Sequence, residues 1–409
     1  MRTILLAIST LFVASSCTDS QKARGFEHVN AETLTGNTKF LAIEEGLNKR
    51  IVIEEFNKDA QIFLPEIVDT VYGVRLDNAP EALIGSIDKI RLTDEAIYLL
   101  DKYYTKSVKK FDRSGKFLAE FGRQGKGPGE HYEPTDFVIT GNNVIIYDQF
   151  KRVLNFYNAE GEFIKAESVP FLAISFHSDN DSTFVFHTLD SDNYHLPKVL
   201  NYSLLWVDSA FTIQYAAGYR ENDKYSSFLS KNNMDNFNNR LYYHEPYSDT
   251  VFRISSEAKI YYDYVFSFPN NQLPDELLLR GNEKKLGSNN QYALNWNNPI
   301  VTDDFLYTTL SVNSTVFTVF FSNSTDNIKF TSGAYHDSTS ILFRPFSNIL
   351  NCEGNVLVGY QDALELYNRT IELKNNNGFD QLDKRLQAFV KDVGKNDNPI
   401  LVFYQLRAF

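Results

Sequence analysis

One unit of sequence occurs twice in succession between residues 88 and 168, and this repeat limits the folds available to the chain. Residues 88–122 align with residues 136–168 once one residue is added in a loop. Both copies contain an apolar run that ends in aspartate, at Asp101 and at Asp148. Further matches lie 46 residues apart and pair Val108, Phe111, Asp112, Gly115 and Phe117 with Leu154, Tyr157, Asn158, Gly161 and Phe163. A repeat of this length indicates a fold built from copies of one structural unit.

Each copy of the unit predicts four short β-strands. They are expected at 88–92, 96–101, 107–112 and 116–122 in the first copy, and at 135–140, 143–148, 153–158 and 162–168 in the second. The turns 112–115 and 158–161 supply the Asp or Asn and the Gly that tight hairpins need for positive φ. Four strands in a period of about 40 to 50 residues are typical of a β-propeller blade, whereas solenoid repeats are shorter and more uniform.

Weaker copies of the outer hairpin follow at 199–217, 249–266 and 314–333, and a further set of strands is expected at 341–360. Two clear and four weak copies predict an all-β chain, a six-bladed β-propeller of four-stranded antiparallel blades over residues 47–409. Two segments interrupt the pattern and are predicted insertions. Residues 269–297 contain two prolines and many asparagines, and residues 379–393 have the apolar spacing of a short amphipathic helix.

Strand-like segments near the two ends of this region predict how the ring closes. Residues 67–76 precede the first complete unit, and residues 399–406 end the chain with a second apolar run. If these two strands pair within one blade, the ring closes and exposes no long sheet edge. We therefore expect the N-terminal and C-terminal strands to share a blade.

The first 46 residues have the composition of an export signal followed by a polar tether. Arg2 precedes an apolar stretch of about ten residues, too short for a membrane span of roughly 20. Small residues then lead to Cys17, so residues 1–16 are predicted to be a signal peptide and 17–46 a tether. The run Ala14-Ser-Ser-Cys17 resembles the lipobox of bacterial lipoproteins, although it lacks the leucine often found three residues before the cysteine. The resemblance implies lipidation of Cys17 and attachment to a membrane; the alternative is a plain secretory peptide with a chance cysteine.

Composition argues against several classes of function. The chain has two cysteines, so no disulfide framework or cysteine-rich zinc site is expected. Its net charge is -12, which argues against nucleic acid as a partner because phosphate binding needs a basic surface. No motif indicates a cofactor, and none is expected. His177, His187 and His195 lack the spacing of the HExxH zinc motif and are interpreted as ordinary strand and loop residues.

The first repeat also carries a resemblance to known propellers. The run from Phe111 to Glu130, followed by Pro134-Thr-Asp-Phe137, is similar to NHL-type propeller repeats. The whole chain resembles the six-bladed β-propeller lipoproteins abundant in Bacteroidetes, with family-like phrases at 83–88, 249–254 and 398–402. Residues 170–240 and 270–340 match loosely. The resemblance implies a propeller at the cell envelope, as an outer-membrane lipoprotein facing either the periplasm or the outside; it implies no activity, because the function of that family is largely unassigned.

Propeller connectivity predicts which loops share a face. The loop between the second and third strands of a blade emerges beside the loop that leads to the next blade. Residues 102–106, 122–130 and 149–152 are therefore expected on one rim. They bring together the candidate ligand-binding residues Lys102, Tyr103, Tyr104, Arg123, Gln124, Lys126, Lys151 and Arg152. Cationic groups beside aromatic rings suit carboxylates, phosphates or sugars.

A simpler interpretation of this rim stays open. The glycines of 122–130 could serve only to shape the crossing, with the basic residues solvated or paired to nearby acids. The loop is not a phosphate-binding P-loop, because Gly127 and Pro128 follow Lys126 and no helix is predicted after it. Asp101 and Asp148, at the same place in each copy, are expected to hydrogen bond the following turn rather than to bind calcium.

Two functions remain for such a propeller. The first is a binding module whose rim presents loops to a protein or glycan, which we favour because no catalytic constellation is visible in the sequence. The second is a hydrolase or lyase with a metal-assisted site in the central channel, of the kind that some NHL-like and lactonase-like propellers contain. Fold alone does not decide between them.

Overall fold

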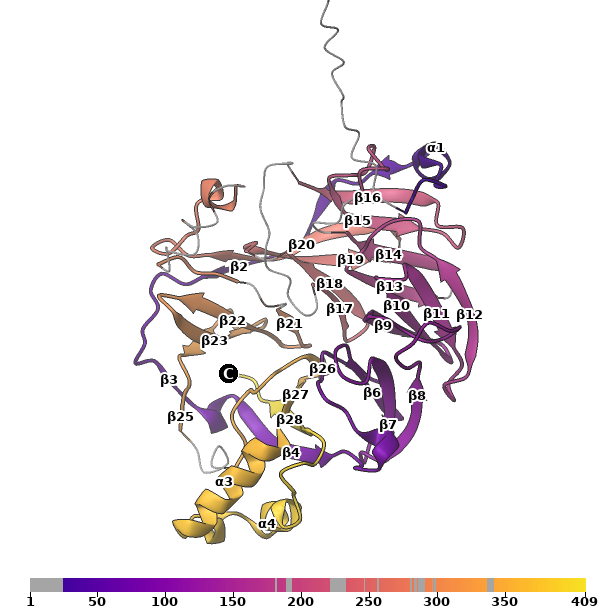
Figure 1. Cartoon of the computed structure of the whole chain (residues 1–409). Helices are drawn as coiled ribbons and strands as arrows, with labels where there is room; N and C mark the ends of the chain where they lie inside the picture. The colour runs from indigo at the N-terminus through magenta and orange to yellow at the C-terminus, as the bar shows by residue number, and fades with distance from the viewer. Residues whose placement is uncertain are drawn as a thin grey trace, which may run out of the picture.

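In the computed structural model, six β-sheets of four or five strands surround a common axis (Figure 1). The structure describes residues 25–409 apart from 181, 189–192, 221–232, 246, 256, 280–281, 283–284, 286–290, 296, 298 and 337–341. The predicted six-bladed β-propeller of four-stranded antiparallel blades is confirmed. We number the blades in chain order from the first repeat, each from its inner to its outer strand.

Blades 1 and 2 are the two clear repeats. Blade 1 contains β5 (Lys89–Leu92), β6 (Ala96–Asp101), β7 (Ser107–Asp112) and β8 (Phe117–Phe121). Blade 2 contains β9 (Pro134–Thr140), β10 (Asn143–Asp148), β11 (Val153–Tyr157) and β12 (Phe163–Ser168). Every one of these strands begins and ends within one residue of its predicted bounds. Gly115 and Gly161 adopt φ of 93° and 90° in the outer hairpins, which explains the glycine at both turns.

Blades 3 and 4 contain the first two weaker repeats. Blade 3 is β13 (Ser175–Asn180), β14 (Thr183–His187), β15 (Tyr202–Val207) and β16 (Ile213–Tyr219). Blade 4 is β17 (Met234–Phe237), β18 (Arg240–His244), β19 (Thr250–Ser255) and β20 (Lys259–Ser267). The outer hairpins predicted at 199–217 and 249–266 are thus confirmed.

Blades 5 and 6 complete the ring. Blade 5 is β21 (Ile300–Val301), β22 (Phe305–Val312), β23 (Thr315–Ser322) and β24 (Ile328–Thr331). Blade 6 takes β26 (Asn351–Glu353), β27 (Val356–Gln361) and β28 (Ile400–Leu406) from the end of the chain, and β4 (Val68–Arg75) from near its start.

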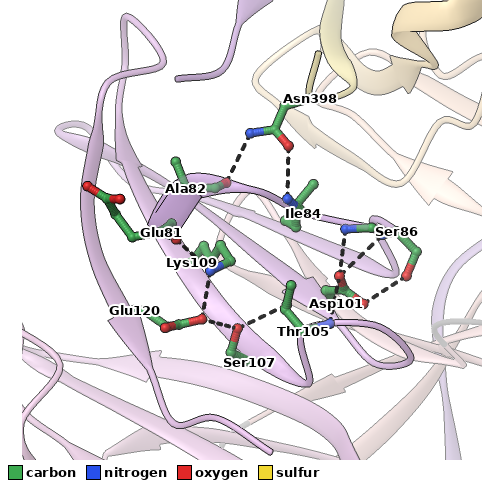
Figure 2. Close-up of polar contacts among 11 residues, drawn as sticks. Glu81, Ala82, Ile84, Ser86, Asp101, Thr105, Ser107, Lys109, Glu120 and Asn398 are labelled. Carbon is green, nitrogen blue, oxygen red and sulfur yellow. Dashed lines mark hydrogen bonds and ion pairs between the residues drawn. The ribbon is translucent and has the colours of Figure 1, made fainter. Parts of the chain in front are cut away.

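The predicted closure is confirmed by the pairing of β4 with β28, which runs from Ile400 opposite Arg75 to Leu406 opposite Val68. Asn398 strengthens this junction just before β28 begins. Its Nδ2 donates to the carbonyl of Asp77 at 2.7 Å. Figure 2 shows two further bonds, in which Nδ2 donates to the carbonyl of Ala82 (3.0 Å) and Oδ1 accepts from the N–H of Ile84 (2.8 Å). The buried amide therefore links the C-terminal strand to the segment that enters blade 1.

The N-terminal segment follows the outside of the ring, as the indigo and purple trace in Figure 1 shows. After α1 (Ala31–Thr35), β1 (Lys39–Phe40) adds a parallel strand to β16, and β2 (Ile43–Val52) adds one to β20. β3 (Gln61–Phe63) then pairs with β25 (Ala334–His336), followed by a 3-10 turn at Leu64–Glu66. Residues 25–46, expected within a polar tether, therefore lie on blades 3 and 4, where their backbone groups complete the outer edges of two sheets.

Helices lie outside blade 6 (Figure 1). α3 (Ala363–Asn375) buries Ala363, Leu366, Thr370 and Leu373 along one face, and was not predicted from the sequence. The helix expected within 379–393 occupies only α4 (Lys384–Val390), after a 3-10 turn at Phe379–Gln381. Further 3-10 turns occur at Pro80–Ala82 and, in the 269–297 insertion, at Asp275–Leu278.

Large apolar side chains fill the spaces between neighbouring blades. Between blades 1 and 2 these include Tyr98, Phe121, Phe137 and Tyr157, all nearly inaccessible to solvent. These aromatic residues therefore serve blade packing. Truncating one such ring to alanine costs about 3–5 kcal/mol in the free energy of unfolding.

Charged side chains cross the centre of the ring. From β5, Lys89 pairs with Asp136 of blade 2, and Arg91 pairs with Asp235 of blade 4, the blade opposite. Nearer the other end of the channel, Asn238 Nδ2 donates to the carbonyl of Gly354 (3.0 Å), and the N–H of Gly354 donates to Asn238 Oδ1 (2.8 Å). These contacts join blade 4 to blades 1 and 6 across the channel.

Candidate functional site

Asp101 holds the first of the three predicted loops. Its carboxylate accepts hydrogen bonds from the backbone N–H groups of Tyr103 (3.1 Å), Tyr104 (2.8 Å) and Thr105 (3.2 Å). It also accepts from the N–H of Gly85 (2.8 Å) and from Ser86, so it joins the 102–106 loop to the loop entering blade 1 (Figure 2). Burial opposes ionisation of Asp101, but these backbone N–H groups outweigh it and lower the pKa of the carboxyl. The expected structural role of this aspartate is confirmed.

Asp148 does the same at the equivalent place in blade 2. Its Oδ1 accepts from the N–H of Lys151 (2.9 Å), and its Oδ2 accepts from the N–H of Tyr132 (2.6 Å). The 149–152 loop and the end of the 122–133 loop are therefore fixed by one side chain.

The glycine-rich loop folds onto itself. The N–H of His131 donates to the carbonyl of Arg123 (2.7 Å), and the N–H of Gly125 donates to the carbonyl of His131 (3.0 Å). Glu130 accepts from the N–H of Gly127 (2.8 Å) and from Arg123 Nε (3.0 Å). Gly122 has φ of 70° and faces the His131 ring, where a Cβ atom would clash. The glycines therefore shape a compact crossing, as the simpler interpretation held.

His131 is buried beneath this loop and anchors it. Its Nδ1 lies 3.1 Å from Asn155 Nδ2, and its Nε2 lies 2.9 Å from the Tyr157 hydroxyl, which donates to the carbonyl of Gly129 at 2.9 Å. Burial, together with the nearby charge of Lys151, lowers the pKa of His131 to about 3. The neutral ring suits this arrangement, because Nδ1 must accept from the Asn155 amide.

Tyr132 is where the three predicted loops meet. Its ring lies 5.5 Å from the ring of Phe150, and the ammonium groups of Lys126 and Lys151 lie 5.8 and 5.5 Å from its centroid. From the 102–106 loop, Lys106 Nζ donates to the carbonyl of Tyr132 (3.0 Å). Lys151 Nζ also donates to the carbonyl of Glu130 (2.7 Å). The structure thus brings the 102–106, 122–133 and 149–152 loops together on one face.

Three aromatic rings of this face are exposed. Phe150, Tyr104 and Tyr103 are 71%, 69% and 66% exposed, the highest values among the exposed large hydrophobic residues that the structure describes. The Tyr104 ring lies against Gly85, where only a glycine leaves room for it. We call the surface formed by Tyr103, Tyr104, Lys126, Tyr132, Phe150 and Lys151 the aromatic–lysine face.

The other predicted residues have structural contacts. The Arg123 side chain is largely exposed but pairs with Glu130, and Gln124 forms a backbone bridge to His131. The backbone N–H of Lys102 donates to Asp88. Arg152 points away toward the N-terminal segment, where it donates to the carbonyl of Gly25 (2.8 Å) and stacks on Phe26 with 4.4 Å between guanidinium carbon and ring centroid. Arg152 is therefore not part of the aromatic–lysine face.

Three residues of this region were not predicted from the sequence: His131, Tyr132 and Phe150. Phe150 lies inside the predicted loop 149–152, and His131 and Tyr132 directly follow the predicted loop 122–130. An aromatic residue at an exposed turn is the signal that pointed to Tyr103 and Tyr104, and it applies equally to Phe150.

The alternative function, a metal-assisted enzyme, would have its site in the central channel. Its carboxylates Asp136 and Asp235 are both paired, with Lys89 and Arg91. Within the described part of the chain, no three His, Cys, Asp or Glu side chains form a group suited to a metal ion. Of the three histidines named above, His187 is buried in β14, and His177 and His195 bond to Asp179 (2.9 Å) and to the carbonyl of Pro170 (2.8 Å). These residues offer no evident metal centre.

The proposed lipidation site Cys17 and the predicted signal peptide lie outside the described residues. Among the described helices, none combines the length and apolar character needed to cross a bilayer.

Comparison with known proteins agrees with the fold. A structure from Bacteroides fragilis, described as a "putative exported protein", superposes with a TM-score of 0.69 at 18% identity over 88% of this chain and 100% of that one. A DUF4221 family member from Bacteroides vulgatus gives a TM-score of 0.47 at 10% identity, over 83% of this chain and 97% of that one. A virginiamycin B lyase from Staphylococcus aureus gives 0.37 at 12%, over 71% and 81%.

No curated protein matches the sequence. The NHL-type character of the repeats and the lipid anchor remain predictions. A family model matches residues 49–405, nearly the whole ring. The chain therefore belongs to the family described as domain of unknown function DUF4934.

Proposed function

We propose that this protein is an exported, lipid-anchored binding module that engages a protein or glycan through the aromatic–lysine face. The observation that carries the proposal is the exposure of Phe150, Tyr104 and Tyr103 on adjoining loops of blades 1 and 2. Exposed rings cost solvation energy unless a ligand covers them, and grouped aromatic residues are typical of recognition surfaces.

The lysines of this face add selectivity to the rings. Lys126 and Lys151 both lie close to the Tyr132 ring on a chain whose net charge is -12. A local cationic group beside flat rings favours ligands that combine an apolar or sugar face with an acidic or hydroxyl group. A protein segment with acidic and aromatic side chains, or an acidic glycan, has this character.

Hydrogen bonds hold the loops of this face in place before a ligand binds. Asp101, Asp148 and the buried His131 fix the three loops through their backbone groups. A surface ordered before binding loses little conformational entropy when a ligand arrives. No cluster of acid, base and nucleophile accompanies the described rings, so we favour binding over the enzyme alternative.

Export and anchoring are supported by the N-terminal sequence and by the description of the Bacteroides fragilis protein as exported. Lipidation of Cys17 would hold the propeller at the cell envelope, at the outer membrane in our proposal. Replacing Cys17→Ser should move the protein from the membrane fraction to the soluble fraction and abolish labelling by a fatty-acid analogue. Unchanged labelling would contradict the anchor.

Site-specific photo-crosslinking tests the binding face. A photoreactive phenylalanine analogue at position 103 or 150 should give a discrete crosslinked protein or glycan in the cell envelope. The same analogue at Phe63, which is 50% exposed on β3, is the matched control and should give none. Equal crosslinking from all three positions, or none from positions 103 and 150, would contradict the proposal.

A further inference from the structure

We infer that a second site, a cavity between blades 3 and 4, binds a neutral saccharide unit. The turns joining β13 to β14, β15 to β16, β17 to β18 and β19 to β20 surround this cavity. In an antiparallel blade these turns emerge at the opposite end from the 102–106 and 149–152 loops. The cavity and the aromatic–lysine face therefore lie on opposite faces of the ring, and the two proposals are independent.

The cavity has a suitable size and an apolar floor. Its volume is about 470 Å³, within the range of small-molecule sites. Val185, Trp206, Leu241, Ile254 and Ala258 line it and belong to the core between the two blades. A floor made by packed strands is already formed before a ligand arrives.

Planar polar side chains line the mouth. They include Asp179, Asp208, Gln214, Asn239 and Arg240. Amide, carboxylate and guanidinium groups around an apolar floor provide both donors and acceptors for the hydroxyl groups of a sugar. The partly exposed Tyr215 adds ring surface against which the C–H face of a sugar can pack.

Charged side chains of both signs line the cavity, and those of Asp179, Asp208 and Arg253 already contact other groups of the protein. His177 Nε2 lies 2.9 Å from Asp179 Oδ1, and Arg253 Nε donates to Asp263 at 2.9 Å. Asp208 accepts from the N–H groups of Ala210 and Thr212, both at 2.9 Å, and from Gln214 Nε2 at 2.8 Å. A neutral polyhydroxyl compound matches this environment better than an ion.

Trp206 makes the site directly observable. The chain has two tryptophans, Trp206 and Trp296, so the Trp296→Phe variant leaves Trp206 as the single indole fluorophore. This variant would be titrated with maltose, cellobiose, lactose and N,N′-diacetylchitobiose at millimolar concentrations. We expect a saturable change in indole emission with at least one of the four.

Two further variants separate this site from the aromatic–lysine face. The double substitution Gln214→Ala, Arg240→Ala removes two exposed side chains of the cavity. It should lower the apparent affinity for the saccharide about tenfold or more, which corresponds to the loss of two hydrogen bonds. Tyr103→Ala, on the other face, should leave it unchanged. The inference is overturned if none of the four saccharides changes the emission saturably, or if the change persists in the double variant.

Discussion

At the scale of single residues, the aspartate that ends the second strand of blades 1 and 2 matters most for the candidate site. Asp101 and Asp148 were identifiable from the repeat, because both copies place a carboxylate at the same position. Their partners in the preceding inter-blade loop, such as Gly85 and Tyr132, were not identifiable, because those contacts depend on how the loops fold back.

Replacing Asp101→Asn should destabilise the protein and loosen the tyrosine loop. The asparagine side chain keeps one acceptor oxygen, but its NH2 group would face backbone N–H groups that now donate to the carboxylate. We therefore expect a loss of about 2–3 kcal/mol in the free energy of unfolding. Denaturant unfolding measures this loss. Asp94→Asn, at an exposed turn of the same blade, is the control and should change stability by less than about 0.5 kcal/mol. Equal effects of the two substitutions would contradict the role of Asp101.

The charged residues of the channel were beyond prediction for a different reason. Arg91 and Asp235 are 144 positions apart in sequence and lie in opposite blades. A lysine and an arginine that alternate with apolar residues on β5 are typical of a half-exposed strand, and only closure of the ring buries them against carboxylates.

At the scale of elements, the sequence predicted antiparallel hairpins well and long-range pairing poorly. The eight strands of blades 1 and 2 follow from local alternation and turn glycines. β2 was missed because its partner β20 lies more than 200 residues away and its own pattern is mostly exposed. α3 has the apolar spacing of a helix but was not predicted, and the predicted segment 379–393 forms only the shorter helix α4.

The closing strand gives a prediction at this scale. A chain ending at residue 399 lacks β28, so β4 and β27 would lose their shared partner and blade 6 would have unpaired edges. We expect this truncated chain to fail to fold cooperatively, as measured by a lost thermal transition. Removal of Arg407, Ala408 and Phe409 alone keeps β28 but loses the stacking of Phe409 on Phe305, so it should lower the transition temperature by several degrees and leave unfolding cooperative. A folded chain without β28 would show that the closure is dispensable.

At the scale of the whole molecule, three fully buried histidines make the ring sensitive to acid. Burial is the main cause that lowers the pKa of His131 and His187 to about 3 and of His244 to about 4. The unfolded chain takes up these protons near pH 6.5, whereas the folded chain does not. The contribution of these histidines to the free energy of unfolding is therefore complete above about pH 6.5. It is lost as the pH falls toward their pKa values in the folded protein.

The expected slope is on the order of 1 kcal/mol per pH unit for each histidine between about pH 6 and 4. Urea unfolding at a series of pH values measures it, and His131→Gln should reduce the slope by roughly one third. A stability that stays constant from pH 7 to pH 5 would contradict the burial of neutral histidines.

Recognition on the aromatic–lysine face would protect its loops, and amide hydrogen exchange of the purified protein measures this protection. The protein would be measured alone and with an isolated cell-envelope fraction. We predict slower exchange at 102–106, 122–133 and 149–152, with no change at these loops in a Tyr103→Ala, Phe150→Ala double variant. Unchanged exchange at all three loops, or the same protection in the double variant, would contradict it.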